Sequence, residues 1–186
     1  VELLQNAEDA GATTWRVIFE RDRIAVWHDG APFDVRDLVG VTSIGQTTKR
    51  RQQIGFFGVG FKSVYEVSDR PRIDSGVFAF EIADVSIPRA LRGRPQGLPD
   101  LPDGGTLLTL PLRRPDDPQR SAAALYARAC ALDPCTLITL ESITTLDFSL
   151  DDPPRRRVLR EERGDGGVAR VRHLPDGEVT RYQMIR

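Results

Sequence analysis

Gly55–Tyr65 reads G-F-F-G-V-G-F-K-S-V-Y, and the interpretation of the remaining chain depends on this stretch. Its three glycines are Gly55, Gly58 and Gly60. They precede a segment in which apolar and polar residues would lie on different faces of a helix. Glycine reaches positive φ values and brings bare backbone amides close to a ligand. A helix that begins there adds unsatisfied N–H groups and a positive dipole end, which favour phosphate. The stretch therefore predicts either a phosphate-binding turn or a glycine-eased turn into a buried helix, and it matches neither the P-loop nor the dinucleotide fingerprint.

The composition is that of a globular chain of 186 residues, of which 40% are hydrophobic. Lys+Arg 26 and Asp+Glu 27 leave a net charge of -1, which disfavours nucleic acid or an anionic membrane as the main partner. Two cysteines, Cys130 and Cys135, indicate buried thiols in a reducing compartment. We predict a cytoplasmic protein without a membrane span or signal peptide. The first residue is Val1 rather than Met, which favours a fragment of a longer protein.

The first helical pattern, E-L-L-Q-N-A-E-D-A-G-A, begins at Glu2. At about 100° per residue, Glu2, Asn6 and Asp9 share one narrow stripe, and apolar residues take the opposite side. Gly11 offers the left-handed stop. The pattern predicts either a polar face with one amide between two acids that serves a site, or an ordinary amphipathic surface helix.

Further elements follow from alternation, helical spacing and turn residues. Alternating apolar residues predict a hairpin of two strands at 13–19 and 23–27. Asp34 and Asp37 form a capping box, with Phe33 and Leu38 at the staple positions, and predict a helix to about Val41. The rest of the first unit is predicted as a polar loop from 42, strands at 72–73, 77–82 and 106–112, a connection without core pattern at 86–105, a helix at 121–132, and strands at 136–140 and 144–150.

The tail from residue 151 begins with D-D-P-P-R-R-R, which has the composition of a linker. Two alternating segments, 168–174 and 178–185, then flank P-D-G and predict a hairpin. We therefore divide the chain into a domain at 1–150 and a linker with hairpin at 151–186, which is a candidate start of a following domain.

The ordered set of motifs resembles the GHKL ATPases, which share the Bergerat fold. The set comprises the acid-amide-acid helix, an acid at a strand end, a basic loop, the glycine-rich turn and a Gly-Thr pair at Gly105 and Thr106. In sequence, the first and third motifs most resemble those of the ninety-kilodalton heat-shock chaperones and, more closely still, those of sacsin-like ATPase domains. The resemblance covers residues 2–112. The resemblance implies an α+β fold, a two-layer α/β sandwich whose mixed, mostly antiparallel sheet is covered on one face by helices. It also implies ATP and Mg²⁺ as cofactors.

The resemblance assigns roles to individual residues. Glu2 corresponds to the general base for the attacking water, Asn6 to the amide that binds Mg²⁺, and Asp9 to the same motif on the nucleotide side. Thr106 corresponds to the threonine that fixes the adenine edge. Lys49 lies on the lid at 43–57 as a candidate cation for the γ-phosphate. The phosphates are assigned to the glycine-rich turn and its neighbours, namely Gly55, Phe57, Gly58, Val59, Gly60 and Phe61.

The second motif departs from the family pattern D-x-G-x-G, in which the aspartate accepts a hydrogen bond from the adenine amino group. Strict register places His28 at the aspartate position and Gly30 at the first glycine, so that Asp29 comes one residue late. We expect Asp29 to read the base, because a carboxylate is an acceptor in either rotamer. His28 is the second candidate for this hydrogen bond. In the third alternative, Asp29 and Gly30 only form a turn, and backbone groups bind the adenine.

The function implied by the resemblance is Mg²⁺-dependent ATP binding with slow hydrolysis, which acts as a conformational switch in a larger protein. The expected partners are ATP or ADP, other domains of a parent chain and a second copy in an ATP-dependent homodimer. The alternative is a nucleotide-sensing or interaction domain that does not hydrolyse ATP. Hydrolysis by the isolated chain is expected to be weak.

Overall fold

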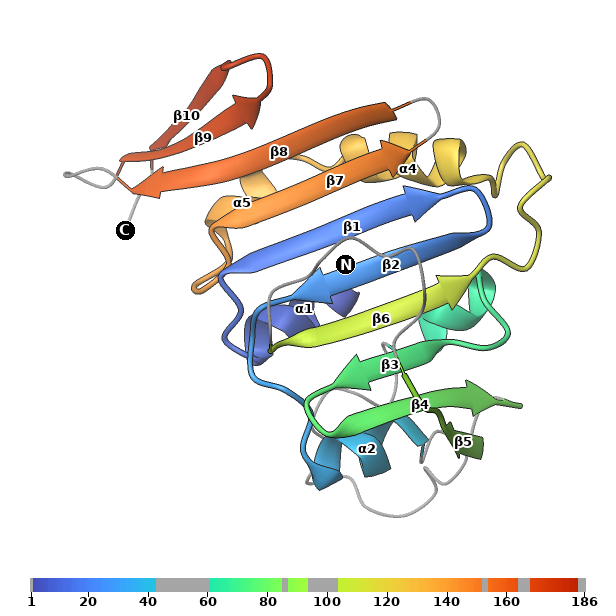
Figure 1. Cartoon of the computed structure of the whole chain (residues 1–186). Coiled ribbons are helices and arrows are strands. Elements are labelled where there is room, and N and C mark those ends of the chain that lie inside the picture. Colours follow the sequence, from blue (N-terminus) through green and yellow to red (C-terminus); the bar gives the residue numbers. More distant parts are fainter. Residues whose placement is uncertain are drawn as a thin grey trace.

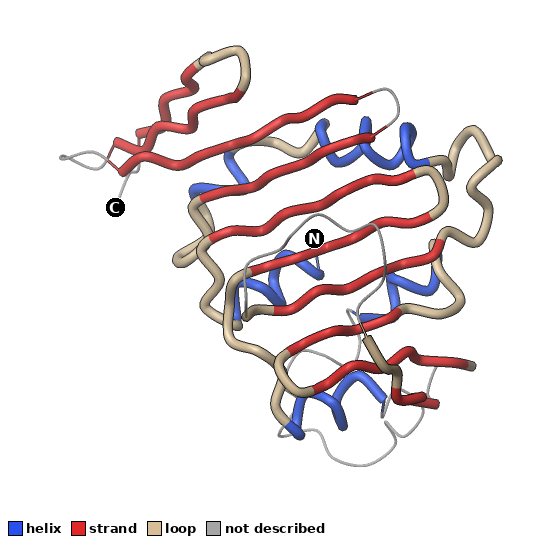
Figure 2. The backbone as a smooth tube through the Cα atoms, in the orientation of Figure 1, coloured by secondary structure: helices blue, strands red, loops and turns tan. Residues whose placement is uncertain are grey.

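The computed structural model describes residues 2–42, 61–84, 87–93, 104–151, 154–163 and 168–183. The described strands form one ten-stranded sheet in the order β10-β9-β8-β7-β1-β2-β6-β3-β4-β5 (Figure 1). Neighbouring strands are antiparallel except for β1 and β7, which pair in parallel. The fold is therefore mixed α/β, with a large and mostly antiparallel sheet and few helices, as Figure 2 shows. This confirms the predicted mixed sheet.

The strands vary from short edge segments to one long strand near the end of the chain. They are β1 (Thr14–Glu20), β2 (Arg23–His28), β3 (Arg72–Ser75), β4 (Phe78–Ala83), β5 (Ile87–Ala90), β6 (Thr106–Pro111), β7 (Thr145–Asp151), β8 (Pro154–Arg163), β9 (Val168–Leu174) and β10 (Val179–Gln183). The helices are α1 (Glu2–Asp9), α2 (Val35–Thr42), the 3₁₀ helix η1 (Phe61–Glu66), α4 (Ala122–Cys130) and α5 (Cys135–Ile138).

The main core lies between the sheet and helices α1, η1 and α4, which lie behind the sheet in the view of Figure 1. Alternation decides which residues enter this core, because side chains two apart share one face of a strand. On β2, for example, Ile24 and Val26 belong to the main core, whereas Ala25 and Trp27 belong to a second buried cluster. The predicted hairpin of β1 and β2 is confirmed, with Glu20 opposite Arg23 at the turn.

The capping box at the start of α2 is confirmed in detail. The Asp34 carboxylate accepts hydrogen bonds from the backbone N–H groups of Arg36 at 2.6 Å and Asp37 at 3.0 Å. The Asp37 carboxylate in return accepts one from the N–H of Asp34 at 2.8 Å. Aspartate therefore does here what glutamate usually does at the third helical position. The hydrogen bonds satisfy helix N–H groups that would otherwise lack partners.

One local prediction about backbone conformation is wrong, and the helix expected after the glycine-rich turn is present in another form. Residues 136–138, predicted as the first part of a strand at 136–140, belong to helix α5. Its first turn is favoured because Asp133 accepts a hydrogen bond from the N–H of Cys135 at 2.8 Å and because proline suits a helix start. Phe61–Glu66 forms a 3₁₀ helix, a tighter form than the helix expected there. The two cysteines are free and half-buried, whereas we expected buried thiols.

Strand β8 occupies the arginine-rich segment whose composition indicated a linker. Its Arg156 makes two hydrogen bonds to the Asp147 carboxylate on β7, at 3.0 and 2.8 Å. Arg16 on β1 reaches the same carboxylate at 2.9 Å, and Asp147 is buried. Charge pairing across strands therefore gives this segment a partner that its composition does not reveal. The predicted hairpin across P-D-G is confirmed as β9 and β10, which continue the same sheet. The domain division at residue 150 stays a prediction.

Candidate functional site

A cleft between α1 and the sheet collects residues from several distant segments. Its volume is about 40 Å³, and it is lined by Leu3, Asn6, Val26, His28, Phe33, Phe61, Ile73, Thr106 and Leu108. Four of the predicted site residues are in this lining: Asn6, His28, Phe61 and Thr106. Apolar walls with a few convergent polar groups are typical of ligand sites. The volume holds a few water molecules, so a purine can enter only if a lining side chain moves.

Helix α1 brings the Asn6 amide to the cleft and leaves Glu2 and Asp9, the two acids of the predicted stripe, outside the lining. Asn6 is 8% exposed, and within the described residues no hydrogen bond to its side chain is found. Glu2 stands one helical turn earlier on the same stripe and is exposed. Asp9 is also exposed, and its carboxylate accepts a hydrogen bond from the Gln5 amide at 3.1 Å. The stripe predicted from sequence therefore places Asn6, rather than either acid, against the sheet.

Glu8 holds α1 in place, and sequence reasoning did not single it out. Its carboxylate accepts hydrogen bonds from three consecutive backbone N–H groups, those of Glu141, Ser142 and Ile143, at 2.7, 2.8 and 3.0 Å. These residues precede β7, so the contact ties the helix that carries Asn6 to a segment far along the chain. No sequence signal marks it, because the partners are backbone groups more than a hundred residues away.

Replacing Glu8 by glutamine is expected to lower the free energy of unfolding by about 2 kcal/mol, because a carboxylate accepts these N–H groups more strongly than a neutral amide. Urea denaturation at neutral pH measures the difference. Glu178→Gln is the matched control, since Glu178 is exposed in the turn between β9 and β10. Equal losses in both variants would contradict the anchoring role of Glu8.

The ends of β2 and β6 form the polar corner of the cleft. His28 and Thr106 are direct register partners across these strands, and both are buried. Ser75 on β3 stands opposite Thr106, and their hydroxyl oxygens are 2.6 Å apart. The Ser75 hydroxyl also accepts a hydrogen bond from the N–H of Phe33 at 2.8 Å. Sequence reasoning missed Ser75, because its position opposite Thr106 follows only from strand register.

His28 is neutral in this corner. Burial lowers the pKa of its imidazole to about 4, although the nearby charge of Asp29 acts in the opposite direction. The backbone N–H of Gly30 donates a hydrogen bond to Nδ1 at 3.2 Å. Because Nδ1 accepts, the single ring proton of the neutral imidazole is on Nε2.

Asp29, the preferred base-reading residue, is engaged elsewhere. Its Oδ1 accepts hydrogen bonds from the N–H groups of Thr13 at 2.7 Å and Thr14 at 2.9 Å, and its Oδ2 accepts one from the Thr13 hydroxyl at 2.5 Å. Burial alone would raise the pKa of this carboxyl, but these hydrogen bonds outweigh burial and hold it below its usual value. Asp29 is not among the lining residues. Its carboxylate therefore braces the connection from α1 to β1.

Two glycines allow these segments to approach closely. A Cβ on Gly30 would lie 2.8 Å from the carbonyl oxygen of Ala10, at the end of α1. Gly105 has a φ of 73°, and a Cβ there would lie 2.0 Å from the carbonyl oxygen of His28. The predicted Gly30 thus has a packing role, and Gly105 is required where β6 begins beside β2.

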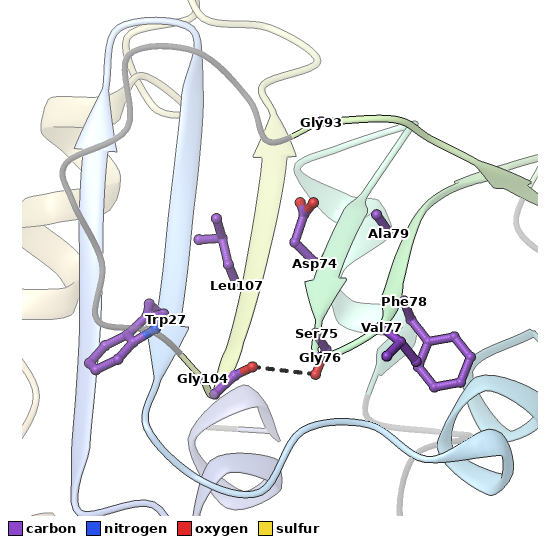
Figure 3. Close-up of a pocket in the computed structure, with 11 residues that line it drawn as sticks. Trp27, Asp74, Ser75, Gly76, Val77, Phe78, Ala79, Gly93, Gly104 and Leu107 are labelled. Atoms are coloured by element: carbon purple, nitrogen blue, oxygen red, sulfur yellow. Dashed lines mark hydrogen bonds between the residues drawn. The ribbon is translucent and has the colours of Figure 1, made fainter.

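The remaining predicted residues, Lys49, Gly55, Phe57, Gly58, Val59 and Gly60, lie outside the described residues. A second cavity of about 270 Å³ lies beside Trp27 and Leu107, on the other face of the sheet (Figure 3). The turn between β3 and β4 forms part of its lining. Asp74, another lining residue, accepts two hydrogen bonds of 2.7 Å from the Arg72 guanidinium. None of the predicted site residues lines this cavity, so the cleft beside α1 is the candidate site.

The described ranges contain neither a metal-ligand cluster nor a membrane-spanning helix. Within them, no group of three or more His, Cys, Asp or Glu residues is placed to hold a metal ion. Among the same residues, no helix is both long and apolar enough to cross a membrane.

The chain is similar to known proteins in part of its sequence. Residues 1–89 match the family model described as the Sacsin domain. Human Sacsin is 33% identical over 94 residues, which cover 40% of this chain and 2% of Sacsin. Protein NO VEIN of Arabidopsis thaliana is 28% identical over 199 residues, which cover 92% of this chain and 7% of that protein. The matches support a sacsin-like family.

The sacsin-like match at residues 1–89 includes α1, the β1–β2 hairpin and Phe61, whereas Thr106 lies beyond it. The chain spans only a small part of either relative. Among solved structures, the N-terminal domain of a DNA repair protein aligns with a TM-score of 0.53 at 14% identity, over 83% of this chain and 49% of that one. At this identity the likeness concerns the fold alone.

Proposed function

We propose that this chain is an ATP-binding module of the GHKL type, a two-layer Bergerat sandwich that binds Mg²⁺-ATP and hydrolyses it slowly. The observation that carries the proposal is the cleft beside α1. Asn6, His28, Phe61 and Thr106 come from four separate segments, and all four line it. The fold-level likeness to the N-terminal domain of a DNA repair protein and the sacsin-like relatives are consistent with such a module.

In this proposal, the polar groups of the cleft contact the two ends of the nucleotide, its base and its phosphates. His28 and Thr106 contact the base at the strand ends. The Asn6 amide oxygen is the protein ligand for Mg²⁺, which needs few protein ligands when phosphate oxygens and water complete its shell. A buried amide without a hydrogen-bonding partner among the described residues suits that role. Bound Mg²⁺ would neutralise phosphate charge. Glu2, one turn earlier and exposed, would orient the attacking water.

The glycine-rich sequence supplies the phosphate end of the same proposal. Gly60 directly precedes Phe61 in the chain, and Phe61 is buried at the cleft wall. Backbone amides of this stretch would hold the phosphates. In the whole protein, nucleotide binding would switch the conformation of attached domains or of a homodimer.

The test is a titration of the purified chain with Mg²⁺-ATP, followed by calorimetry, together with phosphate release. We expect saturable binding that Asn6→Ala weakens in Mg²⁺ but changes little without it. Glu2→Ala should retain binding and lose phosphate release. Glu178→Ala, in an exposed turn on the far hairpin, is the control for both variants. Absence of binding at millimolar Mg²⁺-ATP would exclude the proposal.

One observation favours the alternative of a sensor that binds nucleotide without hydrolysis. Glu2 is exposed and outside the cleft lining, so no described contact holds its carboxylate toward a phosphate. Binding that is retained together with equal phosphate release from wild type and Glu2→Ala would identify the sensor.

A further inference from the structure

We propose that the end of the sheet formed by β8, β9 and β10 binds an acidic segment of a partner protein, rich in aspartate and glutamate. These strands lie beyond β7 at one end of the sheet (Figure 1). The binding surface, which we call the arginine face, is defined by Arg156, Arg160, Arg170, Arg172 and Arg181. None of these residues lines the cleft beside α1, so the proposal does not depend on nucleotide binding.

Alternation along the strands places these arginines on one face. The residues of the same strands that enter the main core or pack against it are Leu159, Val171 and Tyr182. Each arginine stands an odd number of positions from the core residue of its own strand, so it lies on the opposite face of the sheet. Arg156, Arg160, Arg170 and Arg181 are exposed, and Arg172 is half-buried. The arginine face therefore presents guanidinium groups to solvent.

The arginine face carries more guanidinium groups than its carboxylates can pair. The Arg172 guanidinium donates two hydrogen bonds to the Glu162 carboxylate, at 2.9 and 3.3 Å. These hydrogen bonds lower the pKa of Glu162, and the nearby charges of Arg170 and Arg160 act in the same direction. Within the described residues, no ion pair is found for Arg160, Arg170 or Arg181. These three guanidinium groups are therefore left to bind an anion from outside.

The strand register brings like charges together on this face. Arg170 is the direct partner of Arg181, and Arg160 is the direct partner of Arg172. Like charges directly opposite each other destabilise a sheet. The chain as a whole has a net charge of -1, so the excess of arginine is local. Residues that cost stability in this way are typical of a surface that serves binding.

An acidic protein segment fits this face better than nucleic acid does. Duplex DNA is bound through about six to ten phosphate contacts in strongly salt-dependent complexes, whereas three unpaired guanidinium groups are available here. Single strands are bound by stacking of bases on aromatic side chains, and the described residues on this side of β8, β9 and β10 include no aromatic one. Carboxylates match the guanidinium fork, as the contact of Arg172 with Glu162 shows.

The experiment measures the fluorescence anisotropy of a labelled polyglutamate peptide that is titrated with the purified chain at low salt. We expect saturable binding that weakens as salt is added, because salt screens exposed charges. Arg170→Gln combined with Arg181→Gln should weaken binding about tenfold, the loss of two exposed charge pairs. The control combines Arg21→Gln and Arg36→Gln, which remove the same charge from exposed sites in the β1–β2 turn and on α2. It should leave binding nearly unchanged.

Thermal denaturation separates lost binding from lost folding. The arginine-face variant removes a like-charged pair, so its melting temperature should not fall below that of wild type. Absence of peptide binding at low salt would overturn the proposal, and so would equal weakening in both double variants. Tighter binding of a labelled DNA duplex than of the peptide, again weakened by the change at Arg170 and Arg181, would assign the face to nucleic acid instead. None of these results bears on the nucleotide cleft, so the proposed function is tested separately.

Discussion

Replacing Gly105 by alanine is expected to lower the free energy of unfolding by about 4 kcal/mol, a loss that single substitutions rarely reach. Two causes act together. The φ of 73° is unfavourable for any residue with a Cβ, and the added Cβ would lie 2.0 Å from the carbonyl oxygen of His28. That oxygen is part of the backbone, so no side-chain rotation relieves the clash. Strands β2 and β6 would have to separate where His28 faces Thr106.

Gly177→Ala is the matched control for this prediction. Gly177 also has a φ of 73°, but a Cβ there meets nothing within 4 Å. We expect it to lose only the backbone term, about 1 kcal/mol. Urea denaturation of both variants separates the clash from the backbone cost, and nucleotide titration of Gly105→Ala reports on the cleft. Equal losses would mean that β2 and β6 need no close approach at this point.

That His28 rather than Asp29 lines the cleft was within reach of the sequence. Ile24 and Val26 are apolar and alternate, so the period of two already places His28 on their face of the strand. Our preference for Asp29 considered only the chemistry of a carboxylate. The structure adds that β2 ends at His28 and that Asp29 turns back to Thr13 and Thr14. The stripe on α1 was predictable from helical spacing, but spacing alone does not separate the buried Asn6 from the exposed Glu2 and Asp9.

Other features depend on contacts that no local pattern contains. The arginines of β8 look like a solvated linker until Asp147 is placed beside Arg156. Ser75 meets Thr106, a residue of the cleft lining, only through the register of β3 with β6. Strand β5 has four exposed residues, so it has no apolar alternation by which it could be recognised. In each case the contacting residue is distant along the chain, so local propensity and composition cannot predict the contact.

Acidification from pH 7 to pH 4 is expected to cost the folded chain about 3 kcal/mol through His28 alone. The imidazole has an ordinary pKa of 6.5 in the unfolded chain, and burial lowers it to about 4 in the folded one. The unfolded state therefore binds the proton first as the pH falls. The contribution to stability is complete above pH 6.5 and declines as the pH falls toward 4. The lowered pKa of Asp29 acts in a different window, because its stabilisation is lost only below its ordinary value of 3.8.

Urea denaturation of wild type and His28→Gln at pH 7 and at several values down to pH 4 isolates this effect. Glutamine does not titrate, so the variant should lose about 3 kcal/mol less than wild type over that range, while carboxyl contributions cancel in the difference. The variant is expected to be less stable at pH 7, because the hydrogen bond from Gly30 to Nδ1 is changed, and to converge on wild type as the pH falls. Parallel curves over the whole range would show that His28 titrates alike in both states. A buried neutral imidazole at the cleft corner would then be excluded.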